Sequence, residues 1–102
     1  MEKFMQINYN REAEKLTVSP VGRLDTATAS EFEKTICESL DGVAELVLDM
    51  KDVQYIASAG LRVILKIQKV MINQGKMKLT GLNENVMEVF EITGFSNILT
   101  IE

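Results

Sequence analysis

A short apolar strand followed by a long helical pattern constrains the fold of this chain more than any other feature. Residues 43–49 have a continuous apolar centre, which is typical of a strand buried on both faces in a sheet that packs against helices. From residue 58 to about residue 73, apolar side chains recur with helical spacing and leave a narrow polar stripe: Arg62, Lys66, Lys69 and Asn73. We interpret this helix as buried over most of its circumference, with an apolar surface kept for a partner as the alternative.

Further strands and helices are predicted on either side of this unit. Residues 4–9 and 16–21 alternate apolar and polar side chains around the polar stretch 10–14, which predicts a β-hairpin. Thr28 and Glu31 have the spacing of a capping box for a first helix that ends before Gly42. Residues 77–80 are expected to form a strand, Asn83 to cap a third helix that stops at Gly94, and residues 98–101 to add a last short strand.

The predicted order of elements is β-β-α-β-α-β-α-β, within one domain that spans residues 1–102. Strands separated by helices most naturally lie parallel through right-handed crossovers, whereas the two strands of a hairpin are antiparallel. We therefore expect an α/β fold with a mixed sheet of about four to five strands flanked by helices.

The composition disfavours several classes of function. A net charge of −4 argues against a nucleic-acid partner, which needs clustered Lys and Arg. No stretch approaches the roughly 20 apolar residues of a membrane span or the apolar centre of a signal peptide, so we expect a cytoplasmic protein without membrane insertion. The single cysteine, Cys37, has apolar flanks that predict a buried thiol, and His is absent. We expect no metal, no other cofactor and no enzyme activity, because the commonest general base is missing.

Ser58 is the residue that best fits a regulatory site. It follows the buried strand and a short acidic loop, and we interpret it as the N-cap of the long helix. An N-cap hydroxyl is accessible, and the unpaired amides and positive dipole end of a helix favour added negative charge. A phosphate would add about −1.5 to −2 charges there and change any docking surface without unfolding the domain. Ala59 and Gly60 are small enough to let a partner approach the hydroxyl.

A purely structural role is the alternative for the same residues, and their spacing alone does not separate the two. Ser is among the preferred N-caps of any helix, and Gly60 could simply pack against the core. An acyl-transfer enzyme is disfavoured because no His is available to activate Ser58. The run A-S-A-G-L-R also lacks the glycines and the Gly-Lys-Ser/Thr ending of a phosphate-binding loop.

The run D-M-K-D-V-Q-Y-I-A-S-A-G-L-R, residues 49–62, resembles the signature of STAS domains, the family shared by anti-sigma factor antagonists and sulfate transporter tails. The motif G-R-L-D, residues 22–25, followed by Thr28-Ala29, matches the other family motif. The resemblance covers essentially the whole chain, and a free-standing domain of this length is similar to an anti-sigma factor antagonist. It implies partner switching, in which the unmodified antagonist binds an anti-sigma factor that is also a serine kinase.

In that scheme the kinase uses ATP to phosphorylate the serine that matches Ser58, the complex is lost, and a serine phosphatase restores the binding form. The resemblance also places Asp25 near this serine. The residues expected to form the partner-binding surface are Asp25, Thr26, Ala57, Ser58, Ala59, Gly60 and Arg62.

Three positions depart from the commoner family pattern. Ala57 stands where many relatives carry Asp, Ala59 where many carry Ser or Thr, and Arg23 where Glu is frequent. Arg23 thereby reverses a charge on the expected interface. Within the family, the alternative is a STAS scaffold subunit of a lipid-transport or stress-signalling assembly that is not phosphorylated. A response-regulator receiver is disfavoured, because Val21-Gly22-Arg23 replaces the paired acidic residues that follow its first strand.

Overall fold

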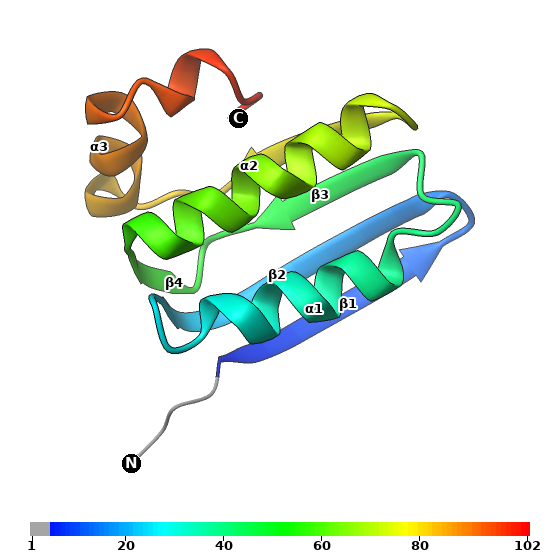
Figure 1. Ribbon diagram of the computed structural model, residues 1–102, viewed down its shortest axis with the longest axis horizontal. Helices are drawn as coiled ribbons and strands as arrows, with labels where there is room; N and C mark the ends of the chain where they lie inside the picture. Colours follow the sequence, from blue (N-terminus) through cyan, green and yellow to red (C-terminus); the bar gives the residue numbers. More distant parts are fainter. Residues whose placement is uncertain (1–4) are drawn as a thin grey trace.

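The computed structural model describes residues 5–102, which form a five-stranded mixed sheet with helices packed on one of its faces (Figure 1). The α/β class and the mixed sheet are therefore confirmed. The strands are β1 (Gln6–Glu12), β2 (Lys15–Leu24), β3 (Glu45–Asp49), β4 (Val53–Ile56) and β5 (Lys76–Thr80). The helices are α1 (Ala29–Ser39), α2 (Ser58–Ile72) and α3 (Glu84–Ile92), followed by the 3₁₀ turn η1 (Phe95–Asn97).

The long strand β2 organises the sheet because it has three neighbours. It pairs antiparallel with β1, and its first residues pair in parallel with β3, which continues to β5 in the order β1-β2-β3-β5. Its last residues, from Gly22 to Leu24, pair in parallel with β4. The register shifts between Gly22 and Arg23, and Gly22 has a φ of 117°, a conformation that favours glycine.

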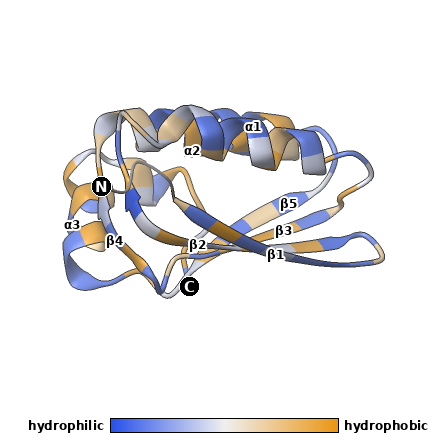
Figure 2. Cartoon of the chain, turned by 90° about the horizontal axis from the view of Figure 1, so that it is seen from below, coloured by the Kyte–Doolittle hydropathy of each residue, from blue (hydrophilic) through white to orange (hydrophobic). Residues whose placement is uncertain are grey.

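The core lies between the sheet and the pair of helices α1 and α2 (Figure 2). Alternate side chains of the strands and one stripe of each helix meet in this layer, as the two periodicities require. Burying one Leu, Ile or Phe side chain here stabilises the fold by about 1.5–3 kcal/mol. The largest fully buried side chains are Phe32, Phe90, Leu16, Leu24, Ile36, Leu46, Leu48, Met50, Ile64, Ile67, Met71 and Leu79.

The opposite face of the sheet is not covered by α1 or α2 (Figure 2). Val47 is 8% exposed and lies in register with Thr17 of β2 and Lys78 of β5. The continuous apolar run of β3 is therefore buried, as predicted. On this face Val47 is flanked by neighbouring side chains of the sheet and not by α1 or α2.

Helix α2 is mainly core, which confirms the interpretation of its broad apolar face. Its buried residues are Gly60, Leu61, Val63, Ile64, Ile67 and Met71. Two apolar side chains near its C-terminal end remain exposed, Val70 at 37% and Ile72 at 66%. On the outer surface, Lys66 Nζ lies 2.8 Å from Glu33 Oε2 of α1, so one ion pair links the two helices.

Two predicted elements differ from the structure. The segment Val53–Ile56 forms the strand β4, although it was expected to belong to a loop. The predicted strand over residues 98–101 is wrong: the chain makes the turn η1 and then a single bridge between Ile101 and Leu79. This bridge places the end of the described chain beside β5, with the Glu102 amide donating to the Leu79 carbonyl at 2.8 Å.

Smaller details near the first half of the chain also differ. The strand β1 extends into the predicted turn 10–14, which shrinks to Ala13 and Glu14, with Ala13 at a φ of 55°. The strand β2 begins at Lys15, one residue earlier than predicted. Phe4, the first residue of the predicted hairpin, lies outside the described residues. Cys37 is exposed on α1, so the prediction of a buried thiol is wrong, since the side chain lies beside the buried stripe of the helix.

Candidate functional site

Two neighbouring parallel strands, β2 and β4, end at the same edge of the sheet (Figure 1). Leu24 and Ile56 are their last residues and lie in register with each other. The Ala57 amide then donates a hydrogen bond to the Leu24 carbonyl at 2.9 Å, which holds the start of α2 against the end of β2. The loop that begins at Asp25 and the first turn of α2 that begins at Ser58 therefore emerge side by side.

Ser58 is the first residue of α2, and its side chain is exposed. The N-cap is Ala57, with an extended backbone at φ −104° and ψ 173°, so the prediction of Ser58 as N-cap is wrong by one position. Within residues 5–102 the Ser58 hydroxyl has no hydrogen-bond partner. Capping therefore does not account for this serine, and its hydroxyl is free to react or to contact another molecule.

Gly60 has an internal role in the structure. It is buried, and a Cβ atom at this position would lie 2.6 Å from Leu24 Cγ, 3.0 Å from the Leu24 carbonyl oxygen and 3.1 Å from Ile56 Cγ1. Its small size therefore allows α2 to approach the ends of β2 and β4. This geometry favours the packing alternative for Gly60, whereas Ala57 and Ala59 are partly exposed beside Ser58.

The Asp25 loop is fixed by its own hydrogen bonds. Asp25 Oδ1 accepts from the amides of Ala27 at 3.0 Å and Thr28 at 3.2 Å. The Thr28 hydroxyl donates to the Arg23 carbonyl at 2.8 Å and accepts from the Asp25 amide at 3.0 Å. The predicted capping box with Glu31 is therefore wrong, because the Thr28 side chain turns back into the loop and makes no capping hydrogen bond.

The carboxylate of Asp25 is held in its ionised form. Partial burial raises its pKa, but the amides of Thr28 and Ala27, the Thr28 side chain and the charge of Arg23 outweigh that effect, and the pKa is lowered from 3.8. A fixed negative charge therefore lies in the loop next to Ser58. Thr26, at the tip of the same loop, is exposed.

Arg23 and Tyr55 form a cross-strand pair that sequence reasoning missed. The two residues are in register on β2 and β4, and the Arg23 guanidinium carbon lies 4.3 Å from the centre of the Tyr55 ring. Arg23 Nε is also 3.6 Å from Asp25 Oδ2, and its side chain is 61% exposed. Tyr55 gave no signal because β4 itself was not predicted, so its partner across the sheet could not be named.

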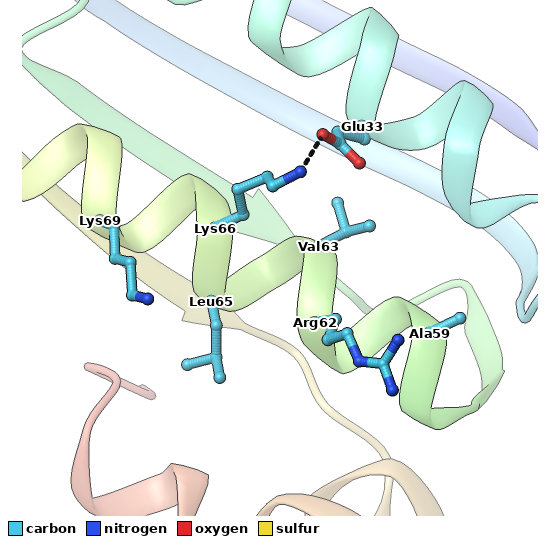
Figure 3. Close-up of a pocket in the computed structure, with 7 residues that line it drawn as sticks. All are labelled: Glu33, Ala59, Arg62, Val63, Leu65, Lys66 and Lys69. Atoms are coloured by element: carbon cyan, nitrogen blue, oxygen red, sulfur yellow. Dashed lines mark hydrogen bonds and ion pairs between the residues drawn. The ribbon is translucent and has the colours of Figure 1, made fainter.

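Arg62 lies on the exposed side of α2 and lines a shallow groove of ≈ 520 Å³ (Figure 3). The guanidinium group extends along the helix toward the first turn, where Ala59 lies (Figure 3). The other lining residues are Glu33, Val63, Leu65, Lys66 and Lys69. The predicted partner-binding residues thus occupy one end of the molecule, with the buried Gly60 beneath them.

The described residues contain no cluster of three or more His, Cys, Asp or Glu side chains that could hold a metal ion. Among the helices of residues 5–102, none has the length and apolar character needed to cross a bilayer.

Comparison with known proteins identifies the family. The model of the STAS domain matches residues 6–102. BtrV of Bordetella bronchiseptica, a candidate anti-sigma factor antagonist, is 39% identical over 82 residues, which cover 78% of this chain and 71% of BtrV. The crystal structure of a candidate anti-sigma factor antagonist from Thermotoga maritima is 26% identical, with a TM-score of 0.87 over 93% of this chain and 84% of that one.

A third comparison extends the likeness of the fold. The anti-sigma factor antagonist SpoIIAA of Bacillus, solved in its phosphorylated form, has a TM-score of 0.71 over 96% of this chain and 90% of that one. At 15% identity this likeness concerns the fold alone. The family model spans both sequence motifs, BtrV is 39% identical over 78% of this chain, and the chain is a member of the STAS domain family.

Proposed function

We propose that this protein is an anti-sigma factor antagonist that binds a kinase-type anti-sigma factor and is switched off by phosphorylation of Ser58. The observation that carries the proposal is the exposed Ser58 hydroxyl, which has no hydrogen-bond partner within residues 5–102 although it lies at the first position of a long helix. Capping does not account for this hydroxyl, because Ala57 occupies the N-cap position. The similarity to BtrV supports the same role.

The proposed binding surface consists of the Asp25 loop and the exposed side of the first turns of α2. Asp25, Thr26, Ala57, Ser58 and Arg62 reach this surface, and Ala59 lies on the wall of the adjacent groove. The loop is held by the hydrogen bonds of Asp25 and Thr28, so the partner would meet a preformed surface. Catalysis belongs to the partners in this proposal: the kinase transfers the phosphate and a serine phosphatase removes it.

Phosphorylation would act on the surface and leave the fold intact. The hydroxyl takes part in no hydrogen bond of the described structure, so converting it to a phosphate ester breaks no internal contact. A phosphate at the start of a helix meets free amides and the positive end of the helix dipole, which stabilise its charge of about −1.5 to −2. The consequence is a new anion beside the carboxylate of Asp25 on the proposed interface.

Intact-mass measurement tests the proposal directly. The purified chain is incubated with ATP and the kinase-type anti-sigma factor of its own organism, alongside the Ser58→Ala variant and the control Ser30→Ala, which changes an exposed serine of α1. We expect one phosphate on the wild type and on Ser30→Ala, none on Ser58→Ala, and loss of the complex on phosphorylation. Stable binding without any phosphate would instead leave the non-phosphorylated scaffold subunit, in a lipid-transport or stress-signalling assembly, as the better explanation.

A further inference from the structure

Helix α2 carries a net positive charge, although the chain as a whole is acidic. Its sequence, SAGLRVILKIQKVMI, holds three cationic residues and no Asp or Glu. The flanking helices are acidic: α1 has three Glu and one Lys, and α3 has three Glu and no cation. Since the whole chain has a net charge of −4, the surface of α2 is a local exception.

The three cations form one stripe on the exposed side of α2 (Figure 3). Arg62, Lys66 and Lys69 are spaced at i, i+4 and i+7, which places them on the same side of a helix. Lys66 is paired with Glu33 at 2.8 Å. The side chains of Arg62 and Lys69 make no ion pair within residues 5–102. Two full charges of the stripe are therefore available to another molecule.

The groove beside the stripe has an apolar component. Ala59, Val63 and Leu65 contribute to its lining together with the three cations. The Leu65 side chain points away from α1, so it lies on the opposite side of the stripe from Glu33 (Figure 3). A surface that alternates cations with small and medium apolar side chains is complementary to a segment that alternates carboxylates with apolar side chains.

We propose that the stripe formed by Arg62, Lys66 and Lys69 receives an acidic segment of the anti-sigma factor. This inference rests on the proposed function and specifies the chemistry of the partner. Most of this acidic chain would repel an acidic segment, whereas α2 carries three cations and no carboxylate, so the stripe would favour one orientation of the complex. Nucleic acid fits less well, because it would meet the surrounding Glu side chains of α1 and α3 along its charged backbone.

The stripe also gives a physical reason for the effect of phosphate on Ser58. Arg62 follows Ser58 by four residues on the same helix, and its guanidinium extends toward the first turn (Figure 3). A phosphate on Ser58 would engage Arg62 within the chain and add negative charge at the head of the stripe. Both effects oppose the binding of an acidic segment, so phosphorylation would release it by electrostatic competition.

Zero-length crosslinking tests the proposal, because a carbodiimide joins a lysine amine only to a carboxylate in direct contact. The full chain is mixed with the kinase-type anti-sigma factor of its organism, treated with the carbodiimide and mapped by peptide mass spectrometry. We expect a bond between Lys69 Nζ and an Asp or Glu in an acid-rich segment of the partner. The variant Lys69→Arg keeps the charge but lacks the reactive amine, so it should bind normally and lose this crosslink.

Charge reversal at Lys69 gives a quantitative test, in which the affinity for the anti-sigma factor is measured. Lys69→Glu should weaken the complex by roughly three- to tenfold at low ionic strength, and the difference should disappear near 1 M salt, where the Debye length is about 3 Å. The matched control is Lys76→Glu, the same charge change at an exposed residue of β5 outside the groove. This control should bind like the wild type.

The outcomes separate the inference from the proposed function. If the wild type binds and is phosphorylated on Ser58 but Lys69→Glu binds equally well, the stripe is not the docking surface and the proposed function stands. If the wild type does not bind the anti-sigma factor, both proposals fail. Crosslinks between two copies of this chain through Lys69, or Lys69-dependent binding to vesicles that contain phosphatidylserine, would show a different occupant and overturn the inference.

Discussion

The substitution Gly60→Ala tests the packing of the site most sharply, because two effects of opposite sign compete. Replacing Gly by Ala in a helix normally stabilises a protein by about 0.5–1 kcal/mol. Here the new methyl group would lie 2.6 Å from Leu24 Cγ and 3.0 Å from the Leu24 carbonyl oxygen. Leu24 is fully buried, so neither atom can move aside without displacing the core. Overpacking of this kind costs about 1–3 kcal/mol.

The net expectation is a loss of about 1–2 kcal/mol in the free energy of unfolding, which corresponds to a decrease of roughly 4–16 °C in Tm for a domain of this size. Urea denaturation followed by circular dichroism measures the loss, and an unchanged m-value would show that the native and unfolded states keep their compactness. A stabilised variant would refute the reasoning, since it would mean that the first turn of α2 does not lie against Leu24.

A double-mutant cycle identifies the contact itself. Leu24→Ala removes the atom that the new methyl group would meet, at a cost of about 2–5 kcal/mol when introduced alone. In the double variant the added methyl group occupies part of the space that the shortened side chain leaves, so the loss should be smaller than the sum of the single losses by about 1 kcal/mol. Additive losses would place the strain of Gly60→Ala elsewhere, for example at Ile56.

Three further predictions follow from individual side chains. Asn83 caps α3 by accepting from the Val86 amide and donates to the Val53 carbonyl, so Asn83→Ala should cost about 1–2 kcal/mol in urea denaturation and Asn83→Asp, which keeps the cap, clearly less. The pKa of Asp25 is lowered in the folded state, so its ionised carboxylate stabilises the fold at pH values above the ordinary pKa of 3.8. This stabilisation is lost as the pH falls through the folded-state pKa, so the difference in unfolding free energy between wild type and Asp25→Asn should shrink on acidification. Although Cys37 is exposed, partial desolvation of its thiol and then the charge of Glu33 raise the pKa of the thiol against the opposing effect of Lys66. Its alkylation at neutral pH should therefore be slower than that of a free thiol and should accelerate in Glu33→Gln.

The central unit of the fold was predictable because it depends on burial, which leaves a strong pattern in the sequence. The apolar centre of β3 and the broad apolar face of α2 identified both elements. The strand β4 was not predictable in this way: it has four residues, with two exposed residues between buried Val53 and Ile56, so neither alternation nor a continuous run is visible. Its pairing depends on the last residues of β2, which lie far away in sequence.

The end of the chain shows the opposite error. Residues 98–101 have strand-like composition, but only Leu99 is buried, and a strand needs backbone pairing over several residues. The turn η1, which begins after Gly94 at a φ of 81°, leaves the chain only a single bridge to β5 at Ile101. Propensity therefore identified the apolar character of the segment, while tertiary geometry determined its structure.

The N-cap residue of α2 could not be predicted from the sequence, and the physical reason is relevant to function. Ser is a better N-cap than Ala by intrinsic preference. The hydrogen bond from the Ala57 amide to the Leu24 carbonyl continues the β4 pairing by one residue and keeps Ala57 extended, so the helix begins one position later. Sheet pairing thus overrides capping preference and leaves the Ser58 hydroxyl without a structural partner among the described residues.

Some residues of the candidate site stabilise the fold and others are only exposed on its surface, and this difference determines how their variants must be interpreted. Gly60 and Asp25 serve the fold, through packing against Leu24 and through the hydrogen bonds of the loop, so weaker partner binding in their variants would combine surface and folding effects. Ser58, Thr26 and Arg62 are exposed, and their substitution should leave the free energy of unfolding within about 0.5 kcal/mol of the wild type. A change in binding at these three positions with unchanged stability would therefore report on the interface alone, and a large loss of stability in Ser58→Ala would contradict the assignment of its hydroxyl as free.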